Sequence, residues 1–110
     1  MSFFDSEIVK KEIREIQELQ REVYTSSSAF MFMTAKQRLE HIDLMQELLD
    51  KQRVFHARMK LCDDPESKEM LKKMRMTAKS LGISDEVTFD ELFDNMQRII
   101  KNMRDSIQVS

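Results

Sequence analysis

Histidine, cysteine and acidic residues are the side chains of this 110-residue sequence that could ligate a metal. Di-metal centres in helical proteins use Glu-x-x-His pairs, in which the carboxylate and the imidazole lie one helical turn apart. In this sequence Arg38 stands three residues before His41, and Arg53 stands three residues before His56. A guanidinium carries only hydrogen-bond donors and cannot ligate a metal. The sequence therefore predicts no metal site.

Cys62 is the single cysteine and the only candidate for a thiol nucleophile. A reactive cysteine needs a lowered pKa and a positioned base, and no local motif around Cys62 indicates either. Gly82 is the single glycine, so a glycine-rich phosphate loop is also missing. We therefore expect no catalytic residue, no cofactor and a non-enzymatic role. An enzyme, the third alternative, would need a pocket with converging polar groups.

A basic ridge is the first candidate for a contact surface. Lys68, Lys72, Arg75 and Lys79 follow one another at spacings of 4, 3 and 4, which places them on one helix face, and Met76 projects to the same outer side. Such a ridge fits an acidic protein surface or the phosphates of a nucleic acid. Nucleic acid is the less favoured of the two, because aromatic residues for base stacking are missing from this helix. The simplest interpretation of the ridge is a solvated outer helix face without a partner.

An apolar run, Phe30, Met31, Phe32 and Met33, is the second candidate for a contact surface. Contiguous apolar surface is rarely left exposed on a monomeric protein. The run therefore either folds beneath the helices or makes a contact with a partner or a second copy. The ten methionines of the chain add weight to a contact, since flexible thioethers suit adaptable binding surfaces, although methionine at helical spacing is more often core. Both readings stay open at this point.

The longest predicted element spans residues 35–62 and must position the others. From Thr34 to Cys62 the chain has neither glycine nor proline, and apolar residues recur every three or four positions, as in an amphipathic helix. Thr34 and Gln37 have the spacing of a capping box at its start. At 1.5 Å per residue the helix is about 40 Å long. A compact chain of this size has a radius of gyration of about 13 Å, so the helix should span the molecule.

One polar residue interrupts the apolar stripe of this long helix. Gln52 lies between Leu48 and Phe55 on the side where the neighbouring positions are apolar. A lone polar residue in such a seam can set the register of two helices or the choice of partner. A glutamine at the edge of the seam needs no such role, and the sequence does not distinguish the two.

Three further helices are predicted around the long one. The first runs from Ser2 or Asp5 to about Tyr24 and ends at the serine-rich residues 25–28, because serines bond locally to the backbone and weaken a helix interior. Phe3 and Phe4 precede its periodic region and should anchor the first turn against another helix.

Local capping signals mark the ends of the last two helices. Pro65 suits the first position of a helix capped by Asp64, and Gly82 suits the left-handed position that ends it. Thr88 and Glu91 form a second capping box, at the start of the fourth helix.

Composition supports one all-α domain covering residues 1–110. Charged residues make up 35% of the chain, with one glycine and one proline, which is typical of long amphipathic helices. We expect a four-helix bundle or paired helical hairpins around the central helix. The net charge of −2 favours neither nucleic acid nor a membrane surface. A single cysteine, with neither a secretory signal nor an apolar run of membrane-spanning length, predicts a cytoplasmic protein.

Three segments resemble a known family: FFDSEIV (Phe3 to Val9), MQELLDKQRVFHARMKL (Met45 to Leu61) and FDELFDNM (Phe89 to Met96). They are similar to a short cyanobacterial family of unknown function that has relatives in cyanophages, and the match in length and motif order covers essentially the whole chain. The resemblance implies a small helical fold in the cytoplasm of a cyanobacterial or phage-infected host cell. It supplies no catalytic residues.

These observations lead to one functional hypothesis and one alternative. The hypothesis is a non-enzymatic protein-binding or regulatory helical module that acts on a host protein or complex through Phe30–Met33 and the basic ridge. The alternative is a nucleic-acid-binding protein that uses the same ridge. A homodimer is a further option, and the identity of a protein partner is beyond the sequence.

Overall fold

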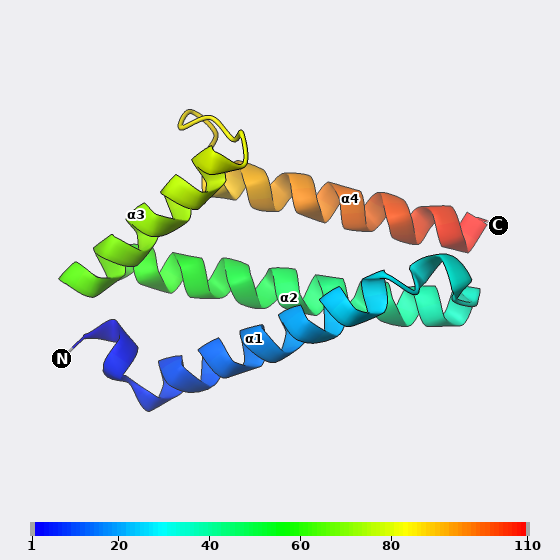
Figure 1. Cartoon of the computed structure of the whole chain (residues 1–110), viewed down its shortest axis with the longest axis horizontal. Coiled ribbons are helices and arrows are strands. Elements are labelled where there is room, and N and C mark those ends of the chain that lie inside the picture. Colours follow the sequence, from blue (N-terminus) through cyan, green and yellow to red (C-terminus); the bar gives the residue numbers. More distant parts are fainter. Residues whose placement is uncertain (1, 110) are drawn as a thin grey trace.

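The computed structural model describes residues 2–109, and helices account for most of them. The described residues contain no strand, and the prediction of an all-α fold is confirmed. Two 3-10 turns, η1 and η2, precede the first and second of four α-helices (Figure 1). The elements in chain order are η1 (Phe3–Asp5), α1 (Glu7–Ser27), η2 (Phe30–Phe32), α2 (Ala35–Leu61), α3 (Pro65–Ser80) and α4 (Phe89–Val109).

The 27-residue helix α2 is the centre of the fold. Helix α1 packs along one side of it and α4 along the other, while the short α3 crosses near its C-terminal end and returns the chain to α4 (Figure 1). The molecule measures 50 × 33 × 20 Å, so the three long helices form a flat layer rather than a square bundle. The prediction of a long central helix is therefore correct, and its neighbours flank it instead of surrounding it.

Both ends of α2 follow from the local sequence. The Thr34 amide donates to Gln37 Oε1 at 2.9 Å, and the Gln37 amide donates to Thr34 Oγ1 at 3.2 Å, which is the predicted capping box. The helix ends at Leu61, ahead of Pro65, because a proline disfavours the helical conformation in the residue before it.

Helix α3 is capped at both ends as the sequence predicts. Asp64 Oδ1 accepts from the Ser67 amide at 2.8 Å, and Asp64 Oδ2 accepts from the Phe3 amide at the same distance, which ties η1 to the start of α3. These backbone hydrogen bonds lower the pKa of Asp64. At the other end Gly82 has φ +89°, and Ile83 donates to the Ala78 carbonyl at 3.0 Å, as in a Schellman motif.

Helix α4 begins at the second predicted capping box. The Glu91 amide donates to Thr88 Oγ1 at 3.1 Å, and the Thr88 amide donates to Glu91 Oε2 at 3.4 Å. Leu92 donates to the Thr88 carbonyl and starts the regular hydrogen-bond pattern of the helix.

The N-terminal helix differs from its predicted bounds in two ways. Its first residues form the separate turn η1, and Ser6, with an extended backbone, divides this turn from α1. At the other end α1 continues to Ser27, beyond the predicted end at Tyr24. The serines do not break the helix because Ser26 Oγ and Ser27 Oγ donate to the carbonyls one turn back, at 2.8 and 2.6 Å.

The tightest apolar packing lies between α2 and α4. Ile42 and Leu49 of α2 are buried together with Phe93 and Ile100 of α4. On the other side of the layer, Val9 and Leu19 are the buried residues of α1. Phe3 packs on Phe55 with ring centroids 5.6 Å apart, so the expectation that the N-terminal phenylalanines anchor the first turn is confirmed.

We expect Ile42→Ala to lower the free energy of unfolding by about 2–5 kcal/mol, because Ile42 is 0% exposed and its removal leaves a cavity. Ile8→Ala is the matched control, since Ile8 is 69% exposed and its truncation should change stability by less than about 0.5 kcal/mol. Urea unfolding followed by circular dichroism measures both. Equal losses in the two variants would contradict the placement of the core.

Candidate functional site

The predicted apolar run forms a turn at the tip of the α1–α2 hairpin, and its side chains divide between two environments. Phe32 is 90% exposed and Met31 is also exposed, whereas Phe30 and Met33 are half-buried. The Phe30 ring packs on the His41 ring with centroids 5.5 Å apart. Residues 30–33, here called the η2 tip, therefore keep one half against the helices and turn the other half to solvent.

The η2 tip is held in place by contacts beneath it. Arg38 donates from Nε to the Phe30 carbonyl and from Nη2 to the Met31 carbonyl, both at 3.2 Å, and its guanidinium lies 5.2 Å from the centre of the Phe30 ring. His41 Nδ1 lies 2.6 Å from Ser26 Oγ, which joins the base of the tip to α1. Burial lowers the pKa of His41. The exposed side chains of Met31 and Phe32 thus stand on an anchored turn.

The lysines at the two ends of the predicted basic ridge lie beside acidic residues. Lys68 Nζ is 2.6 Å from Asp63 Oδ1, and Lys79 Nζ is 3.1 Å from Asp85 Oδ2. The contact with Lys68 lowers the pKa of Asp63, and the contact with Asp63 raises the pKa of Lys68. The ridge therefore presents less net positive charge than its sequence implies.

Arg75, also predicted to lie on the ridge, instead packs against the segment that leads into α4. Its Nη1 donates to the Val87 carbonyl at 2.7 Å, and its guanidinium lies 4.6 Å from the centre of the Phe89 ring. Lys72 and Met76 are exposed. The open part of the ridge therefore centres on these two residues.

The two predicted contact surfaces lie far apart. The η2 tip precedes the first residue of α2 and α3 follows its last, so they sit toward opposite ends of the molecule (Figure 1). A 27-residue helix spans about 40 Å. A small partner would contact one surface or the other.

The structure also contains a site that sequence analysis did not predict, an apolar groove over α2 between α1 and α4. Its wider part has a volume of about 420 Å³, and its lining includes Phe4 together with Met70 and Met74 of α3. A second part, of about 350 Å³, continues the groove, because Gln52 and Met96 line both. We call the two parts together the α2 groove. Along α2, its lining residues are Met45, Leu48, Leu49, Gln52, Phe55, His56 and Met59.

His56 is the buried titratable residue in the α2 groove. It is 4% exposed and lies between the rings of Phe89 and Phe93, with centroids 4.9 and 5.6 Å away. Within the described residues its ring nitrogens make no hydrogen bond. Burial lowers the pKa of His56, the cationic Lys60 and Arg75 lower it further, and Asp90 opposes them.

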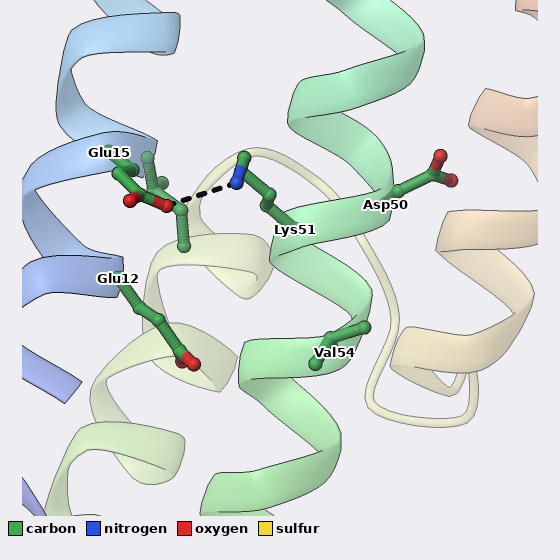
Figure 2. Close-up of a pocket in the computed structure, with 6 residues that line it drawn as sticks. Glu12, Glu15, Asp50, Lys51 and Val54 are labelled. Carbon is green, nitrogen blue, oxygen red and sulfur yellow. Dashed lines mark hydrogen bonds and ion pairs between the residues drawn. The ribbon is translucent and has the colours of Figure 1, made fainter. Parts of the chain in front are cut away.

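A smaller cleft lies between α1 and α2 and contains charged residues (Figure 2). Lys51 Nζ contacts Glu15 Oε2 at 3.0 Å, and this contact lowers the pKa of Glu15. Glu12 forms an ion pair with Arg58, whereas Asp50 points away from both glutamates. The ion pairs of Glu15 with Lys51 and of Glu12 with Arg58 join the two helices.

Among residues 2–109, three or more His, Cys, Asp or Glu side chains nowhere converge in a geometry that could hold a metal ion. Each of the helices there is too short or too polar to cross a membrane.

Comparison with known proteins gives one match. A family model described as a domain of unknown function, DUF1825, matches residues 1–107. Neither a curated protein nor a solved structure matches the chain.

We expect stability to fall as the pH is lowered from 7 to 5. The folded-state pKa values of His41 and His56 lie below the ordinary value of 6.5, so the unfolded chain takes up protons first and gains stability relative to the folded chain. His56→Phe should make the melting temperature less dependent on pH in this range. The stability that comes from the lowered carboxyl pKa values of Glu15, Asp63 and Asp64 is lost at lower pH, below about 4.

Thermal melts between pH 8 and pH 5 in a non-coordinating buffer measure this effect. Wild-type protein and His56→Phe are compared, each relative to its own melting temperature at pH 8. Identical pH profiles for the two proteins would contradict the assignment of His56 as a buried neutral imidazole.

Proposed function

We propose that this chain, which belongs to the family of the domain of unknown function DUF1825, is a non-enzymatic module that binds a protein partner. The observation that carries the proposal is the η2 tip, where Phe32 is 90% exposed on a turn anchored by Arg38. A large apolar side chain in this position gains free energy by entering an apolar pocket on another protein.

The anchoring of the tip favours binding because it lowers the entropic cost of association. Side chains and loops that order only on binding reduce affinity, whereas a turn already fixed in its bound shape does not. A few aromatic residues in desolvated pockets commonly provide most of the binding energy at protein interfaces. Phe32 fits the role of such an anchor, and the flexible side chain of Met31 can adapt to the surface around it.

The open part of the basic ridge supports a second, weaker contact with an acidic protein surface. Lys72 and Met76 are exposed on α3, which lies toward the opposite end of the molecule from the η2 tip (Figure 1). Nucleic acid remains the less favoured ligand, since Lys68 and Lys79 are each paired with an aspartate. Phosphate contacts require cations that are free to replace counterions.

The proposed setting is the cytoplasm of a cyanobacterial or phage-infected cell, where the module would regulate or scaffold a host protein or complex. The segments Phe3–Val9, Met45–Leu61 and Phe89–Met96 support this setting by their resemblance to the cyanobacterial family.

We expect Phe32→Asp to reduce capture of the partner at least tenfold without lowering the melting temperature, because Phe32 makes few contacts within the chain. Leu61→Asp is the matched control, since Leu61 is an exposed apolar residue at the other end of α2. The measurement is capture from host-cell lysate by the tagged full chain, quantified for a protein first identified by photocrosslinking from position 32. Equal capture by Phe32→Asp and wild type would remove the tip from the proposal.

Charge reversal on α3 should separate binding from folding. Lys72→Glu is expected to weaken capture of an acidic partner and leave the melting temperature unchanged, because Lys72 is exposed.

Arg75→Ala is expected to cost about 1–2 kcal/mol of stability, because it removes the hydrogen bond to the Val87 carbonyl and the contact with the Phe89 ring. Urea unfolding measures this effect, and unchanged stability would contradict the structural role of Arg75.

A further inference from the structure

The layer of α1, α2 and α4 has two different faces. Along one side of α2 the exposed residues are mostly acidic, and Glu40, Asp43, Glu47 and Asp50 follow one another at spacings of 3, 4 and 3, with the partly exposed Val54 after them. Along the other side lies the floor of the α2 groove, where Met45, Leu48, Gln52, Phe55 and Met59 follow at spacings of 3, 4, 3 and 4. One face is therefore built for solvent and the other is apolar.

Part of the apolar face is exposed to solvent, although Leu49, His56 and Met59 on its floor are buried. Ile99 of α4 is 56% exposed and Met96 is exposed as well, although both line the groove. Met70 of α3, which lines the wider part, is also partly exposed. Contiguous apolar surface of this kind marks an interaction site in a folded protein.

The total surface of the chain has the size expected of one half of an assembly. The accessible surface is 7972 Å². A compact monomer of 13.1 kDa is expected to expose only about 6,400 Å². The surplus of roughly 1,600 Å² exceeds the roughly 800 Å² per partner that a standard stable interface buries. The radius of gyration, 15.9 Å against about 13 Å for a compact chain of this length, agrees with an uncovered layer.

We propose that a second copy of this chain covers the α2 groove in a two-fold symmetric dimer. Phe4 and α3 line one end of the groove, and neither lines the other end. If the two α2 helices run antiparallel, the end lined by α3 in each copy lies over the end without α3 in the other. The two-fold axis then passes near Gln52, which lines both parts of the groove. This interface is separate from the η2 tip, so the dimer does not depend on the proposed partner.

Gln52 has the chemistry that a residue on a two-fold axis requires. Its amide carries both a donor and an acceptor, so two copies that meet across the axis can exchange a pair of hydrogen bonds. The chain already contains this arrangement between Gln46 and Gln97, whose amides exchange hydrogen bonds at 2.7 Å in both directions. Within the described residues the side-chain amide of Gln52 makes no hydrogen bond. A polar residue in this position would fix the register of the two layers.

A second copy accounts for more of the surface than the other candidate occupants. A small apolar molecule would fill the wider part of the groove and leave Ile99 uncovered, because Ile99 lines the other part. A single helix of another protein would cover the floor along α2, but the surface surplus is about twice what a standard interface takes from one partner. When two copies pair, the apolar face of each layer covers the apolar face of the other.

Light scattering coupled to size-exclusion chromatography tests the dimer on the full chain. The wild-type protein should give twice the monomer mass of 13.1 kDa at micromolar concentration. Ile99→Lys should give the monomer mass, because it places a charge in the apolar interface. Val54→Lys is the matched control and should remain dimeric, since Val54 is 51% exposed beside the acidic cleft on the other side of α2.

A cysteine placed at position 52 tests the position of the axis. In a Cys62→Ser background, Gln52→Cys should form a disulfide-linked dimer under mild oxidation, because Cα atoms within about 7 Å can be bridged. Val54→Cys in the same background should not cross-link. Both variants are compared on non-reducing gels after melts confirm that they are folded.

Each of the other outcomes overturns the proposal. A wild-type mass of 13.1 kDa at several hundred micromolar would show that another occupant, or solvent, covers the groove. A dimer that survives Ile99→Lys would place the interface elsewhere. A dimer in which Gln52→Cys fails to cross-link would exclude the antiparallel arrangement about Gln52.

Discussion

The constraint on which the rest of the structure depends is the length of α2. A helix of 27 residues without glycine or proline extends beyond the diameter of a compact 110-residue domain. The remaining chain is too short to surround it, so α1 and α4 each cover one flank and α3 covers one end. Apolar side chains of α2 face both flanks and the space between them. The open groove is the direct consequence of one long helix with two neighbours.

Polar contacts along the two flanks set the register of the layer more than its stability. Ion pairs join Lys51 to Glu15 on the α1 side, and Arg104 to Asp43 on the α4 side. Half-exposed pairs of this kind contribute little free energy each. Their effect is to fix which turn of α1 and of α4 stands beside each turn of α2. Burial of residues such as Ile42 supplies the stability, and the register keeps the groove continuous.

Sequence analysis was accurate wherever the determining interactions are local. The capping residues Thr34, Asp64, Gly82 and Thr88 set helix ends through contacts within a few positions, so spacing alone revealed them. The predicted end of α1 was wrong. Ser26 was expected to break the helix, but its hydroxyl donates to the Glu22 carbonyl and lies against His41 from the next helix.

The candidate surfaces could be predicted only in part. The sequence left both burial and exposure open for the whole Phe30–Met33 run, and the structure alone separates the exposed Phe32 from the half-buried Phe30. Spacing along one helix placed Arg75 on the basic ridge. Its hydrogen bond to the Val87 carbonyl is a tertiary contact, which such spacing does not show. The groove was missed for a related reason. Its lining comes from all four helices, and a pattern read along one helix does not show whether its apolar stripe is covered by a neighbour.

The dimer inferred here would also change the relation between the two predicted contact surfaces. Within one chain, the η2 tip and α3 stand at opposite ends of α2. Gln52 lies 18 residues after Thr34 and 13 residues before Pro65, or roughly 27 and 20 Å along a helix. An antiparallel pair with its axis near Gln52 would therefore bring α3 of one copy close to the η2 tip of the other. A single partner could then meet Phe32 from one chain and Lys72 from its neighbour, and two such composite sites would allow bivalent binding.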